Sequence, residues 1–240
     1  MKKFFVFLLL CIGISLYAES INVLAAANLS KALEEIKQTY LKDHPKDTIN
    51  ITFISSGKAY AQIKNQAPID LFVSADTSYP QKLYRDGLST EPIVYAQGVL
   101  VLWSKVQKIE NLDSLLNNAI TNIAIPNPDL APYGRAALQA LEQAKLAVKL
   151  MPKLRLATSV AQAHQWVETK NSQAGFGALS LINPNDKQAS VLIVNPNLYS
   201  PIRQALTLTN QGKDKKLAQD FAQFILSSQE ILRKYGYLGP

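Results

Sequence analysis

The sequence predicts an α/β fold of two lobes, in which helices flank sheets of mostly parallel strands. Two observations predict the class: short apolar runs rich in β-branched residues alternate with segments whose apolar residues recur at helical spacing. A third predicts the lobes, because this alternation breaks near residues 98–100 and again near 196–201. About 220 residues follow the apolar N-terminal segment, enough for two cores of about 100 residues each.

The first three strands are short apolar runs, each with a helical pattern behind it. Residues 21–27 predict a strand, and apolar residues then recur at helical spacing across 29–40. Residues 48–55 predict the next strand, followed by a helix that includes Ile63. Residues 69–76 predict the third strand, so the chain begins with a strand and helix alternation typical of parallel sheets.

The third helix has a start and a stop signal, and the run behind it is unusual. Asp76 is suited to cap this helix, and Gly87 to end it. The apolar run 93–103 is long for one strand, and Gly98 offers a place to bend or to change sheets. We therefore interpret this run as a crossover from one lobe to the other.

The rest of the chain resumes the alternation and then returns to the first lobe. The predicted division is lobe I, residues 19–99 and 199–240, and lobe II, residues 100–198, with a ligand cleft between them. The elements behind the crossover are predicted as strands over 120–127, 154–157, 174–180, 190–195 and 202–209 and helices over 133–147, 160–169, 215–226 and 228–235.

The N-terminus has the layout of a secretory signal peptide. Lys2 and Lys3 precede the apolar run 4–16, and Ala18 stands at a plausible cleavage position. Residues 1–18 are therefore predicted to be a signal peptide, although the sequence does not fix the cleavage site. A lipoprotein at Cys11 and a retained anchor are alternatives, the first opposed by the bulky residue before that cysteine.

Composition excludes several classes of function. Removal of the signal peptide removes the single cysteine, so disulfides and thiolate sites are not expected. The formal charge is +7 for the full chain and about +5 without the two lysines of the signal peptide, and this excess is spread along the chain, which argues against nucleic acid and weakly for an anionic ligand. His44 and His164 are the only histidines and lack a second ligand at metal spacing, so neither a metal site nor a cofactor is expected.

Four helix starts follow strands and could bind an anion. Asn28 follows the first strand, Ser56 the second, Tyr133 stands behind a proline, and Val160 follows two hydroxyl residues. Unpaired amides at such starts attract anions. Each start alone is more readily explained as an ordinary cap. Their recurrence at strand ends favours one oxyanion site between the lobes.

The same segments, in order, resemble the periplasmic molybdate-binding proteins of ABC importers, which have the type II periplasmic binding fold. The resemblance covers nearly the whole chain after the signal peptide. It is carried by AAANLSKALEEI (25–36), FISSGKAYAQI (53–63), APIDLFVSAD (67–76), NPDLAPYGRAAL (127–138), ATSVAQA (157–163) and ILRKYGY (231–237).

The resemblance implies a monomeric periplasmic protein that captures molybdate or tungstate and delivers it to a membrane permease. It implies neutral donors to the oxyanion: the side chain of Asn28, the hydroxyl and amide of Ser56, and the main-chain amides of Tyr133 and Val160. Some members add a tyrosine hydroxyl at the position that matches Leu179. The leucine leaves that fifth contact open.

Two alternatives remain at this point. Sulfate, thiosulfate or phosphate would also suit helix starts, and the sequence does not report the size of the site. Ser55 and Lys58 satisfy the Ser-x-x-Lys spacing of some acyl-transfer enzymes, but the companion motifs Ser-Asp-Asn and Lys-Thr-Gly are missing. We therefore expect no catalytic residues and no enzyme activity.

Overall fold

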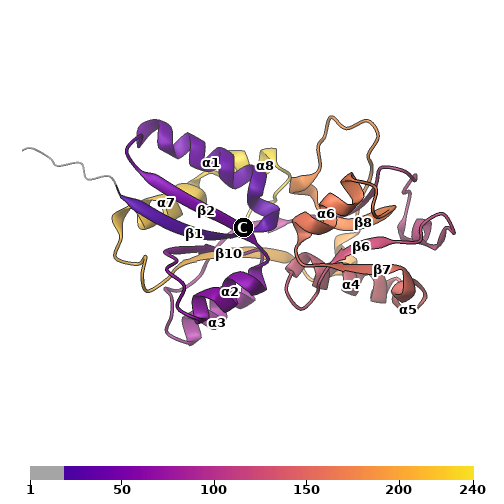
Figure 1. The fold of residues 1–240 in the computed structure, drawn as a ribbon, viewed down its shortest axis with the longest axis horizontal. Coiled ribbons are helices and arrows are strands. Elements are labelled where there is room, and N and C mark those ends of the chain that lie inside the picture. The colour runs from indigo at the N-terminus through magenta and orange to yellow at the C-terminus, as the bar shows by residue number, and fades with distance from the viewer. Residues whose placement is uncertain (1–18) are drawn as a thin grey trace, which may run out of the picture.

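Two five-stranded sheets lie side by side along the long axis of the molecule (Figure 1). The computed structural model describes residues 19–240, so the predicted signal peptide lies outside the described residues. We call the part built around the first sheet lobe I and the part around the second lobe II. The strands in their order are β2 (Thr48–Ile54), β1 (Ser20–Ala26), β3 (Leu71–Val73), β10 (Ile202–Leu208) and β4 (Ile93–Gly98) in lobe I, and β7 (Leu154–Ala157), β6 (Ile123–Pro126), β8 (Ala174–Ala178), β5 (Leu100–Ser104) and β9 (Ser190–Ile193) in lobe II.

Helices cover both faces of each sheet, which confirms the α/β class. In lobe I, α1, α7 and α8 lie on one face and α2 and α3 on the other, while in lobe II α6 lies opposite α4 and α5 (Figure 1). Their bounds are η1 (Ala27–Leu29), α1 (Ser30–Asp43), α2 (Ser56–Lys64), α3 (Ser78–Arg85), η2 (Leu112–Leu116), α4 (Pro132–Gln143), α5 (Ala147–Leu150), η3 (Met151–Lys153), α6 (Val160–Glu168), η4 (Leu179–Leu181), η5 (Pro196–Leu198), α7 (Lys216–Ser227) and α8 (Gln229–Lys234).

The two sheets have equivalent strand arrangements. In each, three neighbouring strands are parallel, the fourth runs against them and the fifth is antiparallel to the fourth. The strand that runs against the others is β10 in lobe I and β5 in lobe II. In each case the preceding strand in the chain belongs to the other lobe, so the reversed strand is the one with which the chain passes from one sheet into the other.

The crossover predicted near Gly98 is present. The run 93–103 forms β4 in lobe I and β5 in lobe II, and the return passage leads from β9 to β10. A Cβ atom at Gly98 would lie 2.1 Å from the hydroxyl of Tyr133 and 2.5 Å from the Gln204 amide. Only glycine fits there, because the backbone passes directly beside buried polar side chains.

The predicted helix 133–147 is divided in the structure. Helix α4 ends at Gln143 and α5 begins at Ala147. Lys145 between them has a φ of 59°, which interrupts a right-handed helix. No glycine or proline marks this break, so periodicity alone could not reveal it.

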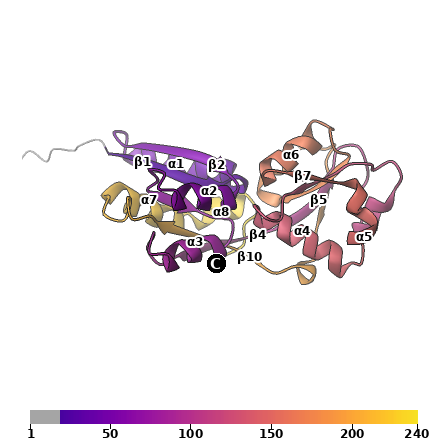
Figure 2. The same cartoon turned by 60° about the horizontal axis from the view of Figure 1, so that its bottom comes forward.

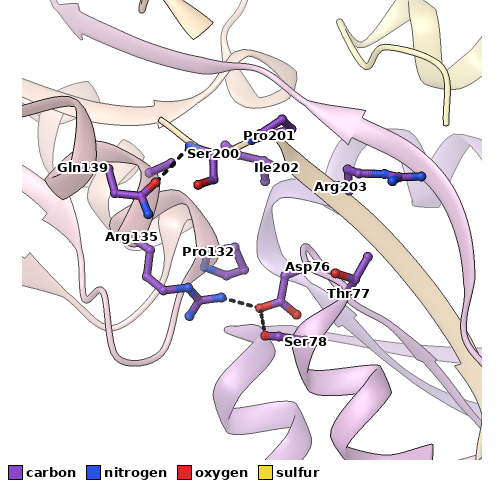
Figure 3. A pocket seen from close by; sticks show the side chains of 11 residues that line it. Asp76, Thr77, Ser78, Pro132, Arg135, Gln139, Ser200, Pro201, Ile202 and Arg203 are labelled. Carbon is purple, nitrogen blue, oxygen red and sulfur yellow. Dashed lines mark hydrogen bonds and ion pairs between the residues drawn. The ribbon is translucent and has the colours of Figure 1, made fainter. Parts of the chain in front are cut away.

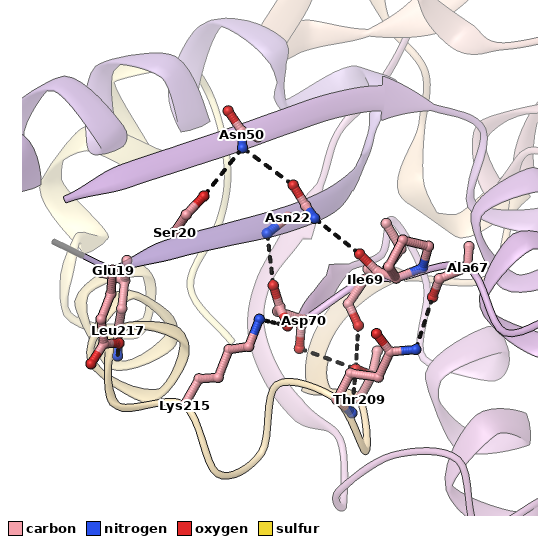
Figure 4. A network of polar contacts seen from close by, with 12 residues as sticks. Glu19, Ser20, Asn22, Asn50, Ala67, Ile69, Asp70, Thr209, Lys215 and Leu217 are labelled. Carbon is pink, nitrogen blue, oxygen red and sulfur yellow. Dashed lines mark hydrogen bonds and ion pairs between the residues drawn. The ribbon is translucent and has the colours of Figure 1, made fainter.

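A buried carboxylate links the segment behind β10 to the first strand of lobe I (Figure 4). Asp70 is 2% exposed; it accepts a hydrogen bond of 2.8 Å from the amide of Asn22 and pairs with Lys215 at 2.8 Å. The amide of Thr209 donates to the Asp70 carbonyl at 3.0 Å. The segment behind β10 is thereby held against β1 and β3.

Trp103 is part of the core of lobe II. It is 1% exposed and stacks on His164 of α6 with ring centroids 4.6 Å apart. Burial, aided by the positive charge of Lys31, lowers the pKa of His164 to about 4. The imidazole is therefore neutral in the folded protein at physiological pH.

Among residues 19–240, no helix is long and apolar enough to cross a membrane.

The first prediction concerns His164. Because its pKa is lower in the folded than in the unfolded protein, protons favour unfolding, and stability should fall between about pH 6.5 and pH 4. His164→Phe should reduce this loss in the free energy of unfolding at low pH by on the order of 1–3 kcal/mol. Urea unfolding of the parent and the variant at both pH values measures the difference. Equal pH dependence in the two proteins would contradict it.

Candidate functional site

The predicted site residues follow neighbouring strand ends in each lobe. Ala26 at the end of β1 pairs in register with Ile54 at the end of β2, so Asn28 and Ser56 each stand two residues beyond a shared sheet edge. In lobe II, Pro126 pairs with Ala157 at the ends of β6 and β7, which lead into α4 and α6. Parallel pairing thus gathers the four helix starts into two adjacent pairs.

The two pairs meet at the interface between the lobes. The amide of Gly57, one residue into α2, donates to the Leu130 carbonyl in the loop before α4 at 2.9 Å. Helix α6 packs against η1, which contains Asn28. Figure 2 shows α4 of lobe II beside β4 and β10 of lobe I. The structure therefore brings Asn28, Ser56, Tyr133 and Val160 to one interface.

Asn28 is fully buried and half of its amide is unpaired. Its Nδ2 donates to Oε1 of Gln204 at 3.0 Å and to the Tyr237 hydroxyl at 2.8 Å. Its own carbonyl accepts from Ser180 of lobe II at 2.8 Å and from Tyr237 at 2.9 Å. Its Oδ1 has no hydrogen-bond partner. An unpaired buried acceptor is costly, so this atom marks an unusual position.

The two serines before and at the start of α2 differ in their surroundings. The Ser56 hydroxyl accepts from the Ala75 amide at 3.0 Å, which fixes its oxygen and leaves its own hydrogen free to donate. The Ser55 hydroxyl is buried and has no partner. Both serines offer hydroxyls at this helix start, and the sequence prediction selected Ser56 as the donor; in the structure the hydroxyl hydrogens of both are available to donate.

The lobe II helices present unpaired amides. The amides of Gly134 and Arg135 donate to the Ala131 carbonyl, and that of Ala163 to the Ser159 carbonyl. The first amides of a helix have no acceptor within the helix, and those of Tyr133 and Val160 have none elsewhere in residues 19–240. Both residues are buried, so their amides are shielded from bulk water.

The Tyr133 side chain has a role that the sequence did not indicate. Its hydroxyl is buried and accepts from Nε2 of Gln204 at 3.2 Å. Burial raises the pKa of Tyr133 well above its usual value, and burial does the same for Tyr95 and Tyr237. These phenols stay neutral, so the interface is polar without carrying their charge.

Further contacts close the interface on both sides. On one side Arg135 pairs with Asp76, and the Tyr79 hydroxyl donates to the Asp129 carbonyl at 2.8 Å. On the other, Lys31 of α1 donates to the Leu181 carbonyl at 2.6 Å. The lobes are therefore in direct contact around the predicted site residues.

A pocket of about 190 Å³ lies beside the Arg135–Asp76 pair and is shown in Figure 3. Asp76 there accepts from Ser78 at 2.8 Å, and Gln139 accepts from the amide of Ser200 in the return passage. Its lining includes Asp76 and Pro132 from the segments that carry the resemblance, but none of the four predicted site residues lines it. The pocket is thus distinct from the enclosed strand-end site.

Leu179 does not place a hydroxyl in the interface. It begins η4, and a Cβ atom at Gly236 would lie 2.8 Å from its side chain. The phenol that reaches Asn28 comes instead from Tyr237, near the C-terminus.

Among residues 19–240 no group of three or more histidine, cysteine, aspartate or glutamate side chains could hold a metal ion.

Sequence reasoning missed Gln204, Tyr95 and the inward orientation of Tyr237. Tyr95 donates to the Ser74 carbonyl and to Gln204 Oε1, both at 2.8 Å. The side chains of Gln204, Tyr95 and Tyr237 are all buried. Gln204 had one available signal, since it is a polar residue within the largely apolar strand segment 202–208. Such a residue is buried only when its amide is paired.

Comparisons with known proteins identify the family of the chain. The family model described as bacterial extracellular solute-binding protein matches residues 21–238. The molybdate-binding protein ModA of Azotobacter vinelandii is 36% identical over 92% of this chain and 90% of its own, and that of Rhodobacter capsulatus is 32% identical over 96% and 94%.

Solved structures give the same result. The periplasmic molybdate-binding protein of A. vinelandii superposes with a TM-score of 0.86 at 33% identity, covering 92% of this chain and 99% of that one. The sulfate-binding protein SubI of Mycobacterium tuberculosis has a TM-score of 0.76 at 13% identity, covering 91% and 86%, and shares the fold. The resemblance to the periplasmic molybdate-binding proteins is confirmed, and the chain belongs to the bacterial extracellular solute-binding protein family.

Proposed function

We propose that this protein binds molybdate, and tungstate as well, at the interface between its lobes and delivers it to the permease of an ABC importer in the periplasm. The observation that carries the proposal is the convergence of four helix starts on one buried interface, with unpaired polar atoms on Asn28 and Ser55. The relatives named for molybdate, one of them called periplasmic, support the choice of ligand and compartment.

The chemistry of the donors suits an oxyanion. We propose that Asn28, the hydroxyl of Ser56 and the amides of Tyr133 and Val160 donate to it, with Ser55 as a further donor. Fixed dipoles at helix starts stabilise an anion without a charged partner. A neutral site also avoids an ion pair in a closed interface, where desolvation is costly.

We propose further that the protein is a binding protein without catalytic residues or cofactor. Lys58, which completes the Ser-x-x-Lys spacing, is exposed, whereas Ser55 is buried and its hydroxyl unpaired. A serine nucleophile needs a base within hydrogen-bond reach.

We propose that the chain acts as a monomer and that the predicted lobes, 19–99 with 199–240 and 100–198, open and close around the anion.

The second prediction tests the ligand. Molybdate and tungstate should raise the melting temperature of the purified protein far more than sulfate, thiosulfate or phosphate at equal concentration, because stabilisation grows with the ratio of ligand to Kd. A thermal-shift panel of the five anions, followed by calorimetry, measures it. Equal binding of sulfate would overturn the proposed selectivity.

The third prediction separates the two serines. Ser56→Ala should weaken molybdate binding by about 1–3 kcal/mol, or roughly 5–150-fold, and should also lower stability because the buried Ala75 amide loses its acceptor. Ser55→Ala should weaken binding without lowering the melting temperature of the ligand-free protein, because its hydroxyl has no protein partner. An unchanged Kd in Ser55→Ala would remove Ser55 from the site.

The fourth prediction concerns the contacts that close the lobes. Arg135→Met removes the pair with Asp76 across the interface, so it should weaken molybdate binding several-fold by making the closed form less populated. Lys216→Met, which removes a pair with Asp220 within α7, is the matched control and should leave the Kd unchanged. Calorimetric titration of both variants provides the comparison, and equal effects would contradict the assignment.

A further inference from the structure

The Ser56 hydroxyl depends on the loop that follows β3. Ser56 accepts a hydrogen bond of 3.0 Å from the amide of Ala75, which fixes its oxygen and leaves its hydrogen free to donate. Ala75 lies between Ser74 and Asp76, and the exposed fraction of each of these four residues is 8% or less. The direction of the Ala75 amide therefore determines where the proposed donor points.

The side chains on either side of Ala75 hold its amide in place. The Ser74 hydroxyl donates to Oδ1 of Asp76 at 3.1 Å, and its oxygen accepts from the Asp76 amide at 3.3 Å. The second bond closes a ring that contains Ala75. The same Oδ1 accepts from the Tyr79 amide at 3.1 Å, which attaches the loop to the first turn of α3. The Asp76 carboxylate thus joins both sides of the loop.

The other carboxylate oxygen of Asp76 faces lobe II (Figure 3). Its Oδ2 accepts from the Ser78 hydroxyl at 2.8 Å and pairs with Arg135 of α4. The Arg135 guanidinium also lies over the ring of Tyr79, 5.6 Å from its centroid. Arg135 stands two residues after Tyr133, whose amide is one of the proposed lobe II donors. Asp76 therefore contacts the support of a proposed donor in each lobe.

The contacts of Asp76 require a carboxylate. Its Oδ1 receives two hydrogens from lobe I, and its Oδ2 receives one from each lobe. An ionised carboxylate accepts on both oxygens, whereas asparagine would place an NH₂ group against two of these donors. Asparagine would also remove the charge that pairs with Arg135. The full set of bonds is therefore specific to aspartate or its ionised equivalent.

We propose that Asp76 is the positioning residue for Ser56, and that it links the direction of this hydroxyl to the lobe II helix that carries Tyr133. The proposed anion lies between the Ser56 hydroxyl and the Tyr133 amide. Asp76 joins the same two elements by a second path that does not include the anion. Because this path consists of protein groups alone, the two donors keep their separation with little ordering by the ligand. This inference rests on the proposed oxyanion function and deepens it.

A mutant cycle separates this role from the closing contact alone. In an Arg135→Met background the pair across the interface is absent, so a carboxylate that served only this pair would have no further effect. We expect Asp76→Asn to weaken molybdate binding about fivefold beyond Arg135→Met, because Ser56 loses its direction. With Ser56→Ala also present, the effect of Asp76→Asn should be about twofold or less. Calorimetric titration measures each Kd, and an equal effect with and without Ser56, or none beyond Arg135→Met, would overturn the inference.

Ser74→Ala provides an independent test that leaves the carboxylate and its pair with Arg135 in place. It removes the hydroxyl that bonds to the Asp76 carboxylate and amide. It should weaken molybdate binding about threefold in the parent and have no effect in a Ser56→Ala background. A Ser74→Ala protein with the Kd of the parent would contradict the positioning of Ser56 by this loop.

Asp70→Asn is the matched control. Asp70 precedes β3 and Asp76 follows it, so the same substitution removes a buried carboxylate at the opposite end of one strand. Asp70 bonds to Asn22 and Lys215 within lobe I. Its replacement should lower the melting temperature and leave the molybdate Kd unaltered. An equal loss of binding in Asp70→Asn and Asp76→Asn would overturn the inference, because general destabilisation would then explain both.

The Ala75 amide provides a readout that needs no ligand. In the ligand-free protein its hydrogen should exchange with deuterium at least about threefold faster in Asp76→Asn than in Asp70→Asn, because its bond to Ser56 is loosened in the first variant only. Exchange followed by nuclear magnetic resonance measures this rate. Equal exchange at Ala75 in the two variants would refute the positioning role.

The outcomes separate this inference from the proposed function. A parent that binds molybdate, with no effect of Asp76→Asn beyond Arg135→Met, would leave the function intact and overturn the role of Asp76. A parent that binds none of the oxyanions would overturn both, because Ser56 would then have no anion to meet.

Discussion

The parallel pairing of β1 with β2, and of β6 with β7, is the constraint on which the site depends. Because the ends of paired parallel strands share one edge, the helix starts behind them have no freedom to separate. Each lobe therefore presents two helix starts to the other, and the interface collects four. An anion at the proposed site would meet dipoles that were oriented during folding, so its binding would require little further ordering.

Much of the fold could be predicted from the sequence, because its signals are local. The strand 154–157 was predicted with its observed bounds, and Gly98 marked the crossover because a backbone beside buried polar groups has no room for a side chain. The break at Lys145 could not be predicted, since nothing in its residue type requires a positive φ. The convergence of the helix starts was a hypothesis that only strand order and register could support.

The site was predictable only in part, and the reason is again physical. Asn28, Ser56, Tyr133 and Val160 stand behind strands, where the pattern of the chain makes them visible. Gln204 and Tyr237 enter from segments more than 170 residues away from Asn28, and their bonds to it depend on tertiary packing alone. The hydroxyl of Tyr133 was overlooked because the resemblance assigned that position a backbone contact.

The place of β10 in its sheet also limits when each lobe can be completed during synthesis. Strand β10 lies between β3 and β4, so β4 has no neighbouring strand in its sheet until the segment behind lobe II has been supplied. Strands β5 to β9, in contrast, are continuous in the chain and complete their sheet without it. A chain that emerges from its N-terminus can finish lobe II while lobe I is still open. Lobe I, and with it the binding interface, is completed only when almost the whole protein is present.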